Sequence, residues 1–259
     1  MDKPSVGIYG LTGCAGDQLA ILNCEDELLD ITGAVNLKFF PMAQTSNDED
    51  SPLDIAFVEG AVVQAEDEHM LRKLRDRAKL LIALGTCAVW GGVQAMKNEI
   101  PREELKRKVY GPQGERFETV APQPLSHFVK VDLALSGCPV EKGQLLQAVA
   151  ALLHGDSPRL PNYAVCTECK MAENPCVLIE AGRLCLGPIT VAGCNARCPS
   201  CAQPCIGCRG PVEEANVSSE IKVLKERGFT WVDIRNRLRT FAAEADSLKI
   251  DSLKEAANA

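Results

Sequence analysis

Cysteine is the residue type that most clearly carries chemistry in this sequence, and it is concentrated in one stretch. Nine of the thirteen cysteines fall there: Cys166, Cys169, Cys176, Cys185, Cys194, Cys198, Cys201, Cys205 and Cys208. Between Leu184 and Pro211 the only charged side chains are Arg197 and Arg209, and most other residues are small, polar or aliphatic. Because such a stretch has too few large apolar side chains for an ordinary core, either metal or disulfides must hold it together.

Iron–sulfur clusters, zinc and disulfides are the three chemistries open to these thiols. Disulfides suit a short secreted domain, but this sequence has 259 residues and shows no apolar export segment after Met1. Zinc could use C-x2-C pairs such as those at 166–169 and 205–208, yet structural zinc sites need only four ligands. Cys198-Pro199 resembles the end of a ferredoxin run, although the full ferredoxin spacing is not reproduced. We therefore expect two iron–sulfur clusters wrapped by loops, with zinc as the alternative.

Three other cysteines each follow a strand-like aliphatic run within a glycine-bearing turn. They are Cys14 after residues 5–9, Cys87 after residues 79–84 and Cys138 after residues 130–135. A fourth run, at 54–58, ends at Glu59. Continuous aliphatic runs are typical of buried parallel strands, whose carboxyl ends meet at one edge of the sheet. Each cysteine alone could be a small buried thiol, but together they predict a site for an anionic metal cluster.

The order of the elements predicts an α/β fold with a doubly wound parallel sheet. The first strand leads into a glycine-rich turn at 10–16 and an amphipathic helix at 17–30, where Cys24 lies mid-helix in the core. The turn lacks both G-x-G-x-x-G and a Gly-Lys-Ser/Thr ending, so nucleotide binding is not predicted.

Further helices and loops follow from periodicity and composition. We expect helices at 66–77 (with Met70, Leu71 and Leu74 inward), 141–154 and 212–227, and a last one containing Trp231, Ile234, Leu238 and Phe241. We expect surface segments at 44–52 and 97–124, the second a candidate partner contact. Residues 154–162 break structure and separate a first domain, 1–155, from a second, 156–259.

Composition excludes several classes of protein. A net charge of −7 and a pI near 5.2 argue against a nucleic acid partner. No run of about twenty apolar residues is present, so no membrane span is expected. Thirteen cysteines without a secretory signal favour a reducing compartment, and we expect a cytoplasmic protein. The three histidines, His69, His127 and His154, show no metal-ligand spacing.

Six segments, taken together and in order, resemble the small, electron-transferring subunit of nickel–iron hydrogenases. They are LTGCAGD at 11–17, VEGA at 58–61, GTCA at 85–88, GCP at 137–139, CLGP at 185–188 and CIGC at 205–208. The similarity is greatest to the cytoplasmic bidirectional group that couples to NAD(P), deazaflavin or heterodisulfide partners. The resemblance implies a flavodoxin-like first domain that holds a proximal cluster, then a cysteine-rich iron–sulfur domain with medial and distal clusters and C-terminal helices.

The resemblance also implies a ligand set for three clusters of the 4Fe–4S type. Proximal ligands would be Cys14, Cys87 and Cys138; distal ligands Cys166, Cys169, Cys176 and Cys185; medial ligands Cys194, Cys198, Cys205 and Cys208, with Cys201 the spare. Glu59 matches an acidic residue that the family places near the subunit interface.

Asp17 is the one departure from the family's pattern, which has cysteine at this place. A carboxylate can ligate iron, and some deazaflavin-linked relatives use aspartate here, so Asp17 is the expected fourth proximal ligand. The alternative is that Asp17 caps the helix that it opens, since aspartate is a favoured N-cap residue. Water, another residue or a three-iron cluster would then complete the site.

The function that the resemblance implies is electron relay within an oxidoreductase that acts on dihydrogen. The nickel–iron site would lie on a large subunit, and electrons would pass through this chain to a diaphorase or ferredoxin-type partner containing flavin or iron–sulfur clusters. The alternatives are a quinone-reductase-like subunit with one cluster and a zinc-stabilised scaffold. The cysteine-rich domain argues against the quinone-reductase alternative.

Overall fold

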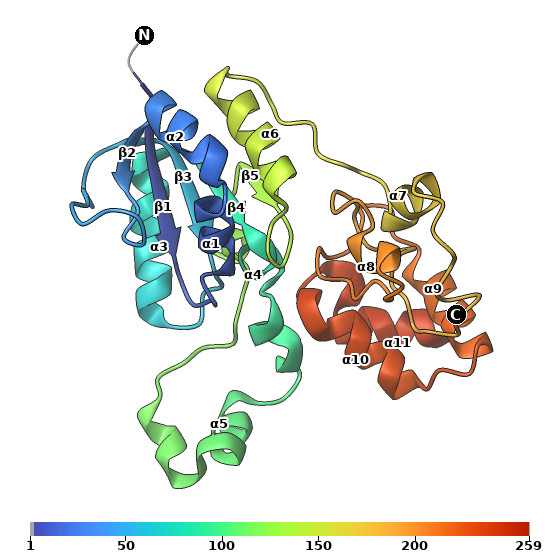
Figure 1. Cartoon of the computed structure of the whole chain (residues 1–259). Helices are drawn as coiled ribbons and strands as arrows, with labels where there is room; N and C mark the ends of the chain where they lie inside the picture. Colours follow the sequence, from blue (N-terminus) through green and yellow to red (C-terminus); the bar gives the residue numbers. More distant parts are fainter. Residues whose placement is uncertain (1–2, 259) are drawn as a thin grey trace. The chain divides into compact units, whose positions relative to one another are not determined.

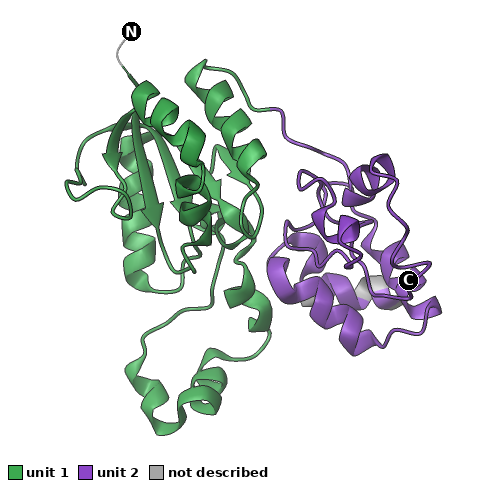
Figure 2. Cartoon of the chain, viewed as in Figure 1, with its two compact units in different colours: residues 1–158 green, residues 159–259 purple. Residues whose placement is uncertain are grey.

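The computed structural model describes residues 3–258 and divides the chain into two compact units, 1–158 and 159–259 (Figure 2). The division falls within the segment 154–162 that the sequence marks as a break in structure. The assignment of clusters to the two parts stays a prediction.

The first unit is built on a parallel sheet of five strands in the order β2-β1-β3-β4-β5 (Figure 1). The strands are β1 Ser5–Gly10, β2 Asn36–Phe39, β3 Leu53–Glu59, β4 Ala78–Leu84 and β5 Leu133–Leu135. This is the doubly wound order of flavodoxin-like folds, in which ligands bind beyond the carboxyl ends of the strands. The predicted α/β fold class is confirmed.

Helices cover both faces of this sheet. The helices of this unit are α1 Gly16–Leu22, α2 Glu25–Ala34, α3 Ala65–Arg77, α4 Gly85–Trp90, α5 Arg102–Tyr110 and α6 Lys142–Leu153, with short 3-10 turns η1 Val93–Lys97, η2 Gly111–Arg116 and η3 Leu125–His127. Side chains alternate along each strand, so Ala56 and Val58 of β3 pack with Leu71 and Leu74 of α3. The segment that includes α5 forms an arm extending from the sheet (Figure 1).

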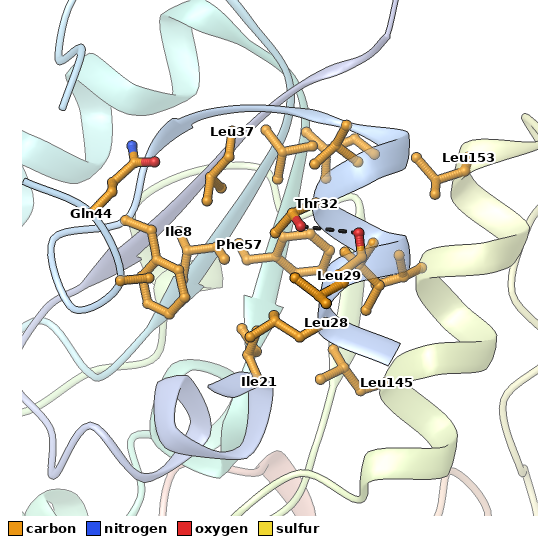
Figure 3. Close-up of a pocket in the computed structure, with 17 residues that line it drawn as sticks. Ile8, Ile21, Leu28, Leu29, Thr32, Leu37, Gln44, Phe57, Leu145 and Leu153 are labelled. Carbon is orange, nitrogen blue, oxygen red and sulfur yellow. Dashed lines mark hydrogen bonds between the residues drawn. The ribbon is translucent and has the colours of Figure 1, made fainter. Parts of the chain in front are cut away.

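The opposite face of the sheet borders an apolar cavity of about 380 Å³ (Figure 3). Ile8, Phe57 and the α6 residue Leu145 are among its walls. Its polar lining side chains are Thr32 and Gln44, and the Thr32 Oγ1 donates a hydrogen bond to the Leu29 carbonyl at 3.1 Å. No cysteine lines this cavity, so it lies apart from the predicted chemistry.

Four details of the first unit differ from the sequence-based expectations. The helix predicted at 17–30 is two helices, and buried Cys24 is the N-cap of α2 rather than a mid-helix residue. The acidic residues that follow Cys24 favour a new helix N-terminus at this point. Met70 is exposed rather than inward-facing. The short strand β2 was not predicted, and β5 is shorter than the run 130–135.

The second unit consists of loops around two short helices, followed by a helical C-terminal part. Its elements are α7 Val165–Met171, α8 Arg197–Ser200, α9 Val217–Glu226, α10 Trp231–Ala242, the 3-10 turn η4 Asp246–Leu248 and α11 Ile250–Asn258. Helix α9 begins later than predicted because the Asn216 side chain accepts the Ser219 N–H at 3.0 Å and caps it. Ile234 and Leu238 of α10 are buried, as the helical spacing predicts. Helix α11 was not predicted.

We expect the loss of Asp132 to destabilise the first unit. Its Oδ2 accepts the Leu81 N–H at 2.9 Å and is 2.5 Å from the Arg75 guanidinium, and its side chain is 16% exposed. Asp132→Ala should lower the free energy of unfolding by about 1–3 kcal/mol, because it leaves these donors without their acceptor. The exposed Asp50, paired with Lys73 at 3.1 Å, is the control, and Asp50→Ala should cost about 0–1 kcal/mol.

The same pair of variants tests the pH dependence of this contact. Burial of Asp132 favours a higher pKa, but the hydrogen bonds from Leu81 and Arg75 outweigh it and lower the pKa. A carboxyl whose folded-state pKa is lowered contributes stability above its unfolded pKa of about 3.9, and this contribution is lost as pH falls through the folded pKa. Denaturant titrations should therefore show that the unfolding free energies of Asp132→Ala and Asp50→Ala become similar in acid. Equal losses of unfolding free energy in the two variants at neutral pH would contradict this account.

Candidate metal centres

The carboxyl ends of four strands form one row across the sheet of the first unit. The last paired residues are Gly10, Glu59, Leu84 and Leu135 of β1, β3, β4 and β5. Three of the segments that follow these strands carry a predicted ligand: Cys14 beyond β1, Cys87 in α4 and Cys138 beyond β5. The parallel sheet therefore brings these three segments to one edge, as the aliphatic runs predict.

The charges of Cys14 and Asp17 act on both the Cys87 and the Cys138 thiols. Burial raises the pKa of the half-buried Cys87 thiol to about 11, and the charges of Asp17 and Cys14 raise it further. Cys138 is exposed as a residue, but its thiol is partly buried. This burial raises the pKa of the thiol to about 11, and the charges of Cys87, Asp17 and Cys14 add to the rise. All four predicted proximal ligands thus share one small region, and their ligation of iron stays a prediction.

Asp17 is buried, with 5% of its surface exposed, and it does not cap a helix. The N-cap of α1 is Ala15, and no side chain of that residue makes a capping bond. The Asp17 Oδ1 instead accepts the Val140 N–H at 2.8 Å, which ties α1 to the segment that follows Cys138. Burial raises the pKa of Asp17 to about 7; the Val140 bond opposes this rise and the Glu59 charge adds to it. The helix-cap alternative is therefore wrong.

Glu59 supplies the cap that Asp17 does not. It is 2% exposed, and its carboxylate oxygens accept the Asp17 N–H at 3.4 Å and the Gln18 N–H at 3.0 Å. These are free N–H groups of the first turn of α1, which a negative charge stabilises. Glu59 thus holds the start of α1 against the end of β3. Its place near a subunit interface stays a prediction.

Two residues that the sequence analysis missed also position this site. The Gln94 amide oxygen lies 3.3 Å from the Cys87 Sγ, and its Nε2 donates to the Thr12 carbonyl at 3.0 Å. The Thr86 Oγ1 accepts the Gly137 N–H at 3.1 Å, beside Cys138. The Gln94–Thr12 and Thr86–Gly137 contacts join residues 82 and 51 positions apart in the sequence, so no local spacing could have revealed them.

In the second unit, the predicted distal ligands share one region. Cys166 and Cys169 lie three residues apart on α7 and so face the same way. A Cβ on Gly187 would lie 3.1 Å from the Cys166 Sγ and 3.6 Å from the Cys185 Sγ, so glycine gives both thiols room. Burial raises the pKa of Cys166 to about 12, and the charges of Cys185, Cys169 and Cys176 add to this rise.

Of the predicted medial ligands, Cys205 and Cys208 lie close together and beside the distal set. Burial raises the pKa of Cys205 to about 12, and its neighbours Cys185 and Cys208 contribute. The Cys205 N–H donates to the Cys185 Sγ at 3.2 Å, so the predicted medial and distal sets adjoin. The Arg209 Nε donates to the Ala192 carbonyl at 3.0 Å, which anchors the segment before Cys194 beside Cys208. Cys198 is half-buried in α8, and Cys201 is exposed just after it.

The donors in each group are of the kind that an iron–sulfur cluster takes, namely thiols with one carboxylate at Asp17. All thirteen cysteines are free thiols, so the disulfide alternative is not supported. Within residues 3–258, no three His, Cys, Asp or Glu side chains lie close enough together to hold a single metal ion. A cluster of four irons is larger than one ion, and thiolates are its usual ligands. Among the helices of residues 3–258, none has both the length and the apolar composition of a membrane span.

Comparison with known proteins identifies the family of this chain. The family described as "NADH ubiquinone oxidoreductase, 20 Kd subunit" matches residues 14–152. Sulfhydrogenase 2 subunit delta of Pyrococcus furiosus is 40% identical, over 92% of this chain and 98% of the relative. A subunit of the F420-non-reducing hydrogenase vhu of Methanocaldococcus jannaschii is 32% identical, over 81% of this chain and 83% of the relative.

A solved structure supports the same assignment. A chain of an NAD+-reducing nickel–iron hydrogenase in its H2-reduced state superposes with a TM-score of 0.56 and 28% identity, over 61% of this chain and 96% of that one. The match to the sulfhydrogenase subunit extends further and takes in the cysteine-rich unit. The chain therefore belongs to the NADH ubiquinone oxidoreductase 20 Kd subunit family, and within it this protein is a hydrogenase subunit of the small, electron-transfer type.

Proposed function

We propose that this chain carries electrons from dihydrogen oxidation at a nickel–iron large subunit, through three 4Fe–4S clusters, to a diaphorase or ferredoxin-type partner. The observation that carries the proposal is the gathering of candidate donors at two places: the four proximal candidates at the sheet edge, and the distal candidates with Cys205 and Cys208 beside them in the second unit. A one-cluster, quinone-reductase-like subunit would leave the nine thiols between Cys166 and Cys208 without a role.

In this proposal each group of side chains holds one cluster. The proximal ligands are Cys14, Asp17, Cys87 and Cys138; the distal ligands are Cys166, Cys169, Cys176 and Cys185; the medial ligands are Cys194, Cys198, Cys205 and Cys208. A bound cluster takes up and releases one electron at a time, with a potential set by its ligands, nearby hydrogen bonds and burial.

The chain's own residues position the ligands and limit their contact with water. Glu59 joins the start of α1 to β3, and Asp17 joins it to the segment that follows Cys138. These hydrogen bonds hold the segments that carry the proximal donors in place. Cys185 and Cys205 are buried, with 7% and 6% of their surfaces exposed, so they would hold their clusters away from solvent.

Partners and location follow from the same proposal. The chain would associate with the large subunit and with an acceptor subunit that contains flavin or iron–sulfur clusters. Its net charge of −7 does not favour nucleic acid. Free thiols in this number favour a reducing compartment, and we place the protein in the cytoplasm.

Anaerobic purification of the native complex tests this function. We expect a nickel-containing partner chain to accompany this one, and dihydrogen gas to bleach the visible iron–sulfur absorption of the complex. The chain separated from its partner should be reduced by dithionite and remain unaffected by dihydrogen, because the nickel–iron site is elsewhere. Reduction of the separated chain by dihydrogen, or a native complex without nickel, would overturn the proposal.

A further inference from the structure

Glu168 lies between two predicted distal ligands on α7, yet its carboxylate contacts the loop that carries Cys194. The Oε1 accepts the Gly193 N–H at 2.7 Å, and the Oε2 accepts the Ala196 N–H at 3.0 Å. The side chain thus reaches 25 and 28 residues along the sequence, from one predicted ligand set to the other. Its two oxygens bind the backbone on both sides of Cys194.

The loop needs such a partner because of its backbone conformation. Gly193, Asn195 and Ala196 have φ values of 115°, 53° and 48°, which is the left-handed region. This region is unfavourable for residues other than glycine and persists where surrounding contacts fix it. In this conformation the Gly193 and Ala196 N–H groups both point toward one carboxylate, as in the concave backbone sites that bind anions. The Glu168 carboxylate occupies that site and fixes the direction in which Cys194 points.

Glu168 also places negative charge beside the Cys194 sulfur. Its Oε2 is 3.9 Å from the Cys194 Sγ. A negative charge at this distance disfavours the addition of an electron to a cluster bound through Cys194.

We propose that Glu168 is a positioning residue that fixes the Cys194 ligand loop of the medial cluster from the helix that carries distal ligands, and that it lowers the reduction potential of the medial cluster. This inference rests on the proposed function, since it takes Cys194 as a medial ligand. It adds a residue that lies outside the twelve proposed ligands and links the two ligand sets of the second unit.

Two substitutions at Glu168, compared with a matched control, test the inference. Glu168→Gln removes the charge and one of the two acceptors but keeps a side chain of the same size, so it should raise the medial cluster's reduction potential while the proximal potential stays unchanged. Glu168→Ala removes both acceptors, so it should lose the medial cluster, or about four irons per chain. Glu173→Gln removes the charge of an exposed glutamate shortly after α7 and should change neither quantity.

The measurements are iron content and a redox titration followed by electron paramagnetic resonance, on anaerobically purified complex. An unchanged medial potential in Glu168→Gln, or the same upward shift in Glu173→Gln, would overturn the inference, even if Glu168→Ala fails to fold. If wild-type protein itself lacks a medial cluster, then the proposed function fails and the inference fails with it. A medial cluster that is present but insensitive to Glu168 leaves the proposed function standing.

Discussion

Replacing Gly85 with alanine is expected to abolish the proximal cluster. Gly85 has a φ of +82°, and a Cβ there would lie 1.8 Å from the Asp17 Oδ2. Real side chains do not approach so closely, and both atoms belong to segments held by the sheet edge. Asp17 must therefore leave its position, and the Val140 N–H loses its acceptor with it.

The expected size of this effect has two parts. A left-handed backbone costs alanine about 1–2 kcal/mol, and forcing extra volume into a packed site costs about 1–3 kcal/mol. Unfolding free energy should fall by about 2–5 kcal/mol, and iron by about four per chain. Gly155→Ala is the control, because Gly155 has a φ of +75° and its Cβ would meet no atom within 4 Å. Equal iron content in the two variants would show that the Gly85–Asp17 contact is not needed for the cluster.

Substitutions of Asp17 are expected to change the proximal cluster itself. A carboxylate is a harder donor than a thiolate and binds soft iron–sulfur sites less strongly. Asp17→Cys should therefore keep a four-iron cluster with a shifted reduction potential and an altered rate or bias of hydrogen oxidation. Asp17→Ala should lose at least one iron and also destabilise the fold by about 1–3 kcal/mol, because the buried Val140 N–H is left unpaired.

Asp17→Asn separates these two roles. Its amide oxygen can still accept the Val140 N–H, so the fold should keep most of its stability, whereas a neutral amide is a weaker ligand for iron. Asp30→Asn, at an exposed position in α2, is the matched control and should change neither property. Proximal signals in electron paramagnetic resonance that are identical in all three Asp17 variants and wild type would leave Asp17 with a structural role alone.

Much of the fold follows from the sequence because buried parallel strands are continuous aliphatic runs. This pattern locates β1, β3 and β4, and hence the edge to which Cys14 and Cys87 belong. The pattern misses β2, a four-residue edge strand that contains Lys38 and has no fully buried residue. The pattern also makes β5 too long. The Leu81 N–H donates to the Asp132 side chain, so it is not available to pair with a carbonyl of a longer β5.

The candidate sites were predictable only in part, because some of the residues that form them act through contacts distant in the sequence. Cysteine spacing and strand ends are local features, so they are visible in the sequence. The role of Glu59 as the cap of α1 depends on a contact 41 residues away, and that of Gln94 on a contact 82 residues away. Contacts of this kind depend on the folded topology and leave no periodic signal. The same holds for Glu168, whose neighbours in sequence point only to the distal set.

The central claim, that this chain holds three iron–sulfur clusters, is tested most directly by counting metal in anaerobically purified protein. Twelve candidate ligands, four to a cluster, predict about twelve irons and about twelve acid-labile sulfides per chain. Elemental analysis for iron and zinc, together with a sulfide assay on the same sample, gives the answer. A count near four irons, or zinc in place of iron, would contradict the three-cluster account.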